Sequence, residues 1–276
     1  MKKAFIFTIF ILLLLIPSKV FAHELFIQVK EDEASSELQV DVMWGHLRDF
    51  LDQANYEDYE LYVRYPNGET ELLELEKIGV QARAFVDADE EGEYVFWANR
   101  MPSTYTPGGG ETRLSVQMAK ATHQVGGANL TADEPIGLLL EIVTEESLAD
   151  FKTGKVKGSV LFEGEAIPDV TLNAYGPKGE HLEGVSAEDG TFEFNFQSNG
   201  EWLMKASVET EEAGSLEGEE YELIGRTSTL LVDTSSSADD NLTSTNSLTM
   251  VAVFVIGLLL GTAITFVCVK KKQAKK

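Results

Sequence analysis

The chain has 276 residues and a formal net charge of −24, with 46 Asp and Glu against 22 Lys and Arg. Eight of the basic residues lie among the first 22 or the last seven residues, so the part between them carries 14 basic against 46 acidic side chains. A surface this acidic repels polyanions, which excludes nucleic acid as a partner. Two interpretations stay open: solubility in salty or alkaline surroundings, and a raised local concentration of cations.

The first 22 residues have the order of a secretory signal peptide. Lys2 and Lys3 precede the apolar run 4–16, and Val20 and Ala22 occupy the positions where signal peptidase requires small residues. We therefore expect cleavage between Ala22 and His23. An uncleaved anchor helix is the alternative, although the apolar run is short for a membrane span.

Residues 23–145 are predicted to form a first antiparallel β-sandwich. Apolar and polar residues alternate in several short runs that Gly, Pro and Asn turns separate, a pattern typical of sandwich strands. These runs are 38–44, 61–65, 93–98 and 114–118. The segment 47–60 is expected to be a loop or a short helix.

A second sandwich is predicted over residues 155–232, after a connection at 144–154. Its alternating runs are 156–162, 170–175, 191–196, 202–208 and 223–232. The polar segment 233–247 follows and contains no aromatic residue, which indicates a flexible stalk.

The C-terminal part predicts a membrane anchor. Residues 248–269 contain no charge and are long enough to cross a bilayer as one helix. The basic tail 270–276 follows, which places the C-terminus in the cytoplasm and the preceding domains outside. Gly257 and Gly261 form a GxxxG pattern in this helix, which predicts a homodimer. The predicted fold is therefore all-β: two tandem antiparallel β-sandwich domains followed by a single transmembrane helix.

His23 is the first candidate metal ligand, because cleavage would leave its imidazole beside a free α-amino group. The amine and ring Nδ1 can chelate one ion, and a second histidine completes a three-nitrogen site called a histidine brace. Such ligation suits copper and nickel. The alternative is an N-terminus that is simply frayed and solvated.

His46 and His123 are the candidates for the second histidine. His46 follows Gly45 at the end of a predicted strand, where Asp49 could orient its ring. The run 114–118 leads to His123 and could return it to the same sheet edge. Both histidines could instead be ordinary surface residues. His181 is expected to be exposed in a turn, and Glu24 is a weaker carboxylate candidate.

Several segments together resemble a family of exported bacterial proteins of the nickel/cobalt uptake transporter or periplasmic cobalt-transport-component type. The matching segments are Ala22-His23, Gly45-His46, 92–96, 140–143, "GSVLFEGEAIPDVTLNAYGPKG" at 158–179, 188–192 and 199–202. The resemblance implies handling of nickel or cobalt, with a metal transporter in the same membrane as partner, and the nitrogen donor set adds copper as a further candidate metal. The second domain also resembles carboxypeptidase-regulatory and collagen-adhesin sandwich repeats.

The sequence predicts a membrane-anchored, extracytoplasmic metal-binding protein that is not an enzyme. No GxSxG, HExxH, phosphate-binding glycine loop or CxxC motif occurs in it. Two alternatives remain. One is a surface adhesion or structural protein without metal, and the other is a copper oxidase with a histidine brace.

Overall fold

The computed structural model describes residues 23–32, 35–48, 51–53, 55–127, 130–131, 133–149 and 151–234. The predicted signal peptide, transmembrane helix and basic tail lie outside these residues, as does the stalk from residue 235 onward. Within the described ranges, no helix is long and apolar enough to cross a membrane. These ranges belong to one compact unit.

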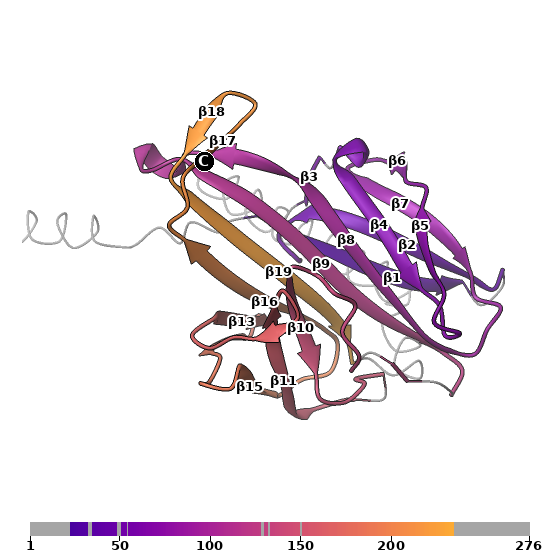
Figure 1. Cartoon of the computed structure of the whole chain (residues 1–276). Coiled ribbons are helices and arrows are strands. Elements are labelled where there is room, and N and C mark those ends of the chain that lie inside the picture. Colours follow the sequence, from indigo (N-terminus) through magenta and orange to yellow (C-terminus); the bar gives the residue numbers. More distant parts are fainter. Residues whose placement is uncertain are drawn as a thin grey trace, which may run out of the picture. The chain divides into compact units, whose positions relative to one another are not determined.

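The structure is all-β, as predicted, and it is built around one eight-stranded sheet (Figure 1). Its strands pair antiparallel, except that β9 and β19 run parallel. In spatial order they are β14 (His181–Val185), β13 (Thr171–Tyr175), β16 (Glu201–Thr210), β19 (Leu223–Asp233), β9 (Arg113–Val125), β8 (Gly92–Tyr105), β4 (Tyr59–Arg64) and β5 (Thr70–Leu73).

Two smaller sheets pack on this large sheet. The five-stranded sheet contains β1 (Glu24–Asp32), β2 (Glu37–Gly45), β3 (Leu51–Asp52), β6 (Glu76–Ile78) and β7 (Gln81–Asp87). The four-stranded sheet contains β10 (Leu140–Thr144), β11 (Gly154–Phe162), β12 (Glu165–Ala166) and β15 (Thr191–Phe196). The remaining elements are the hairpin of β17 (Gly214–Leu216) and β18 (Glu219–Tyr221) and the 3-10 turns η1 (Tyr56–Asp58) and η2 (Pro107–Gly109).

Strand alternation sends neighbouring residues of the large sheet into two different cores. On β9, Met118 enters the second core while Ala119 enters the first, and on β19, Leu230 and Leu231 divide in the same way. The first core lies against the five-stranded sheet and the second against the four-stranded sheet. The central strands are therefore apolar on both faces.

The tandem division into residues 23–145 and 155–232 stays a prediction, but strand pairing crosses it twice. Strand β10 lies before the predicted connection and pairs with β11 beyond it. Strand β9 pairs with β19, from the far end of the second segment. The expected loop or short helix at 47–60 contains β3 and the 3-10 turn η1.

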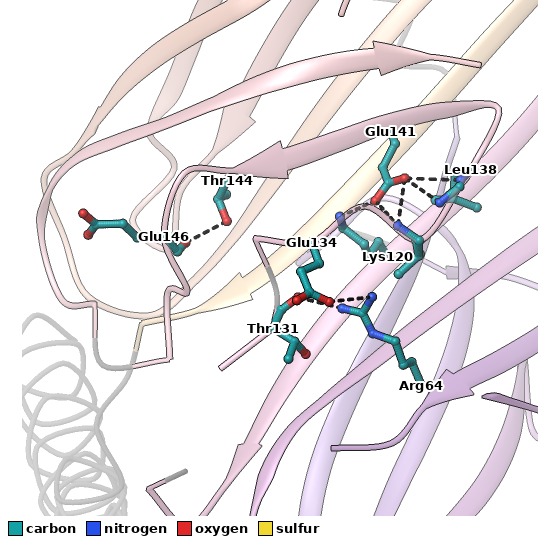
Figure 2. A network of polar contacts seen from close by, with 10 residues as sticks. Arg64, Lys120, Thr131, Glu134, Leu138, Glu141, Thr144 and Glu146 are labelled. Carbon is teal, nitrogen blue, oxygen red and sulfur yellow. Dashed lines mark hydrogen bonds and ion pairs between the residues drawn. The ribbon is translucent and has the colours of Figure 1, made fainter. Parts of the chain in front are cut away.

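A buried polar network anchors the segment that precedes β10 (Figure 2). Glu141 Oε1 lies 2.8 Å from Lys120 Nζ, and the Glu141 carboxylate also accepts the backbone N–H groups of residues 136–138. Nearby, Arg64 donates to the carbonyl of Thr131 at 2.6 Å, and Glu93 accepts the N–H of Thr131 at 2.7 Å. These bonds satisfy backbone groups that have no strand partner.

Candidate metal centre

The register of the β1–β2 hairpin brings His23 and His46 together. Glu24 pairs with Gly45 at the end of the hairpin, so one step further His23 faces His46 across the two strands. The two imidazole rings stack with centroids 5.2 Å apart and planes 20° apart. Two of the three predicted ligands are therefore neighbours.

His23 is held from two further sides. Its ring stacks on Trp44 with a centroid distance of 5.6 Å, and its Nε2 atom lies 2.7 Å from Oδ2 of Asp52. Asp52 belongs to the short strand β3 and pairs with Trp44 across the backbone ladder. The His23 side chain keeps about a third of its surface in solvent (32%), so the position is accessible.

His46 contacts a buried carboxylate that also contacts a lysine. Its Nδ1 atom lies 3.0 Å from Oε2 of Glu24, and the other oxygen of Glu24 lies 3.0 Å from Nζ of Lys205. Glu24 is 4% exposed, and Lys205 comes from β16 of the large sheet. Burial, reinforced by the negative charges of Glu24 and Glu183, raises the pKa of neighbouring Tyr175 to about 12. Glu24 thus connects the histidine pair to the large sheet.

The structure does not bring His123 to this pair. His123 pairs with Tyr94 within the large sheet, and its Nε2 atom lies 3.2 Å from Oε2 of Glu31. Glu31 and Glu24 lie near opposite ends of β1, roughly 23 Å apart at ~3.3 Å per strand residue. His123 therefore does not belong to the candidate site.

His181 also has its own contacts, at the start of the edge strand β14. Its ring stacks on Tyr175 with a centroid distance of 4.8 Å, and its Nε2 atom lies 2.9 Å from Oδ1 of Asn173. These contacts give His181 a local structural role on the large sheet.

The paired histidines can supply two nitrogen donors to a metal ion. Among the residues that the structure covers, no group of three or more His, Cys, Asp and Glu side chains is arranged to hold a metal by itself. A third nitrogen would come from the α-amino group of His23, which is an amide nitrogen while residues 1–22 remain attached. The two imidazoles are thus two of the three nitrogen donors that the predicted brace requires.

Sequence reasoning missed Asp52, Trp44 and Lys205 as neighbours of the site. The hairpin register offers a signal for Trp44, because it lies on β2 two residues before His46, which directly follows that strand. No local pattern points to Asp52, and Lys205 is distant in the sequence and arrives through the packing of two sheets. These contacts depend on tertiary structure.

Solved structures similar to this chain include an adhesin and a domain of a biofilm-associated protein. One is a Ca2+-stabilised adhesin that helps an Antarctic bacterium reach out and bind ice; it is 12% identical, with a TM-score of 0.22, and the match covers 76% of this chain and 48% of the other. The BSP domain of a biofilm-associated protein is 10% identical, with a TM-score of 0.17 and coverage of 78% and 52%. The TIE protein of Bacillus anthracis is 11% identical, with a TM-score of 0.16 and coverage of 78% and 59%. The chain thus spans about half the length of these structures.

No curated protein matches the sequence. One family model does, over residues 20–210, which is more than half of the chain and includes both histidines of the pair. The description of this family assigns no function, so the resemblance to nickel and cobalt uptake proteins is not confirmed. The protein belongs to the family described as "Domain of unknown function (DUF4198)".

Proposed function

We propose that the protein is a membrane-anchored, extracytoplasmic metal-binding protein that holds a transition metal ion at His23 and His46. The observation that supports this proposal is the register of the β1–β2 hairpin, which stacks the two imidazoles at 5.2 Å beside the predicted cleavage point. The α-amino group created by cleavage is the third donor. Anchoring by residues 248–269 and delivery to a metal transporter rest on the sequence alone.

The donor set favours Cu(II) over Ni(II) and Co(II). Three nitrogen donors suit all three ions, and the general affinity order for divalent metals rises from cobalt through nickel to copper. The α-amino group has a reference pKa of ~8, so protons compete only modestly with a metal at neutral pH. We therefore expect the tightest binding with Cu(II).

The test compares the chain that begins at His23 with a chain that carries one extra residue before it. Cu(II) and Ni(II) are titrated into both and followed by calorimetry and by quenching of Trp44 fluorescence, since the Trp44 ring stacks on His23. The extra residue converts the amine into an amide. Loss of a residue that only orients a metal ligand weakens metal binding by about 10–100-fold. We expect the extra residue, which removes a donor atom, to weaken Cu(II) binding by more than this.

Histidine variants provide the matched controls. His46→Ala should weaken Cu(II) binding strongly, whereas His123→Ala and His181→Ala should leave it unchanged, because these side chains contact Glu31 and Tyr175 instead. Equal affinity for the processed and extended chains would contradict the proposal and favour a structural or adhesive surface protein.

A further inference from the structure

The large sheet continues beyond the first core as a surface of polar and small residues. Ala98 and Ala119 are paired on β8 and β9 and belong to the first core. Because every second residue of a strand lies on the same face, the next positions on this face form two further rows across β8, β9 and β19. The first row is Arg100, Gln117 and Thr227, and the second is Ser103, Ser115 and Gly225. These six residues form the polar face.

Arg100 has no carboxylate in ion-pair contact among the residues that the structure describes. Its Nη1 atom donates to the Ser103 hydroxyl at 3.2 Å, its guanidinium lies 4.5 Å from the centre of the Trp44 ring, and it also contacts the Tyr59 hydroxyl. Its Nε–H group is buried and has no hydrogen-bond partner. The other arginines differ: Arg64, Arg83, Arg113 and Arg226 contact carboxylates, and Arg48 donates to two backbone carbonyls. In this acidic chain, Arg100 thus keeps a positive charge that can bind an anion.

Gln117, the cross-strand neighbour of Arg100, has an unsatisfied acceptor. It is 9% exposed, its Nε2 atom donates to Ser115 Oγ at 3.1 Å, and its Oε1 atom has no hydrogen-bond partner. A buried acceptor without a donor destabilises the protein, and a ligand that supplies an O–H group would remove this cost. Directly opposite residues on paired strands have Cβ atoms ~4.5–5.5 Å apart. One small ligand can therefore contact both side chains.

Gly225 leaves open space over the second row. Among the described residues, a Cβ atom at this position would meet only the backbone oxygen of Leu114, at 3.9 Å. Gly225 and Ser103 both keep part of their surface in solvent. Glu209 pairs with Gly225 across the strands, but its carboxylate forms an ion pair with Arg113. The row is thus reachable from solvent, and the carboxylate beside it already has a cation.

We propose that the polar face binds a small hydroxycarboxylate, with the carboxylate on Arg100 and the hydroxyl group on Gln117. A planar guanidinium donates to carboxylate oxygens in a fixed geometry. A hydroxyl group on the neighbouring carbon can donate to Oε1 of Gln117. Trp44 contacts both Arg100 and His23, but this binding requires no metal ion. The proposal therefore does not depend on the proposed function.

The test uses three matched probes on the metal-free full chain. Glycolate has both groups, acetate lacks the hydroxyl group, and ethylene glycol lacks the carboxylate. Saturation-transfer NMR of the probes gives their affinities, and the nitrogen-15 signal of the Arg100 Nε–H group locates the binding. We expect glycolate to shift this signal and to bind up to about 10-fold more tightly than acetate, since it makes one more hydrogen bond. Ethylene glycol should cause no shift.

Two substitutions separate the roles of the two side chains. Arg100→Lys keeps the charge but removes the planar group, so it should weaken glycolate binding by about 10-fold, and it also identifies the Arg100 signal by deleting it. Gln117→Met removes the acceptor at similar size, so glycolate should lose its advantage over acetate while acetate still binds. A purely structural role of Gln117 would not change this preference.

Gly225→Val fills the open space without a contact closer than 3.9 Å at its Cβ atom, so the fold should tolerate it. It should abolish the shift that glycolate causes at Arg100. Gly127→Val, beyond the other end of β9, is the matched control, because a Cβ atom there meets nothing within 4 Å. No binding of glycolate, equal affinity for glycolate and acetate, or unchanged glycolate binding in Arg100→Lys and Gly225→Val would overturn the proposal.

Discussion

Lys120 and Glu141 form an ion pair in which both side chains are almost fully buried, at 2% and 1% exposure. Burial lowers the pKa of Lys120, and the adjacent Glu141 opposes that shift. The transfer of two charges out of water costs several kcal/mol per ion, and only good geometry with further hydrogen bonds offsets that cost. Glu141 has these bonds, because it also accepts the backbone N–H groups of residues 136–138.

Removing one partner of this pair should therefore destabilise the fold strongly. Lys120→Met leaves the Glu141 carboxylate buried without its cation, and we expect a loss of about 3–5 kcal/mol in the free energy of unfolding. The double variant Lys120→Met with Glu141→Gln should recover part of this loss, because it removes the buried charge while the amide oxygen still accepts backbone N–H groups. Urea unfolding of the single and double variants measures both effects.

The pair of Lys155 and Glu193 is the control for this measurement. Its atoms approach to 2.7 Å, but the two side chains are 67% and 44% exposed. Lys155→Met should leave the free energy of unfolding almost unchanged, because solvent screens this exposed pair. A similarly small loss for Lys120→Met would show that the buried pair does not stabilise the fold.

At the scale of elements, Gly158 allows β11 to pack between its neighbours in the four-stranded sheet. A Cβ atom at this position would lie 2.3 Å from the backbone oxygen of Val143 on β10 and 2.7 Å from Cζ of Phe192 on β15. Because one of these atoms belongs to the backbone, a side-chain rotation cannot relieve the contact. The four-stranded sheet therefore requires glycine here.

Gly158→Ala should destabilise the protein by about 1–3 kcal/mol, the usual cost of overpacking a core. Gly127→Ala is the matched control, since a Cβ atom there meets nothing within 4 Å. Thermal or urea unfolding of the two variants provides the comparison. Equal stability of both variants would mean that β10 and β15 move apart at little cost.

At the scale of the molecule, the large sheet couples the two cores. Strands β9 and β19 contribute side chains to both cores, and the Thr229 hydroxyl on β19 donates to the carbonyl of Leu25 on β1 at 2.6 Å. Unfolding one core would remove the surface on which the other core packs. The described residues should thus unfold as one cooperative unit.

Two tryptophans can test this coupling. Trp44 packs against the first core and Trp202 is fully buried in the second. Each variant keeps one of these two tryptophans as the reporter and has the other tryptophans changed to Phe. After correction for differences in stability, both reporters should show the same fraction of unfolded protein at each urea concentration. Separate transitions for the two reporters, or an intermediate with only one core formed, would support independent domains.

Period-two alternation in the sequence was enough to predict the all-β class, because this alternation is a local consequence of strand geometry. It predicted β2, β4, β8 and β9 in the first half and most strands of the second half, although β8 and β9 each continue seven residues beyond the predicted runs 93–98 and 114–118. The alternation does not say which strands pair. Pairing of β9 with β19 joins residues about 110 positions apart, and no short-range pattern records such a contact.

The candidate site, like the fold, could be predicted from the sequence only in part. The sequence singled out His23 and His46, and a hairpin contact between strands that are adjacent in the chain brings them together. The distance of His123 from this pair depends on where β1 crosses the large sheet. His123 contacts Glu31, near the opposite end of β1. The contacts of Asp52 and Lys205 required the packing of separate strands. Residue type and local periodicity thus identified the candidate ligands, whereas long-range packing decided which of them lie side by side and which other side chains contact them.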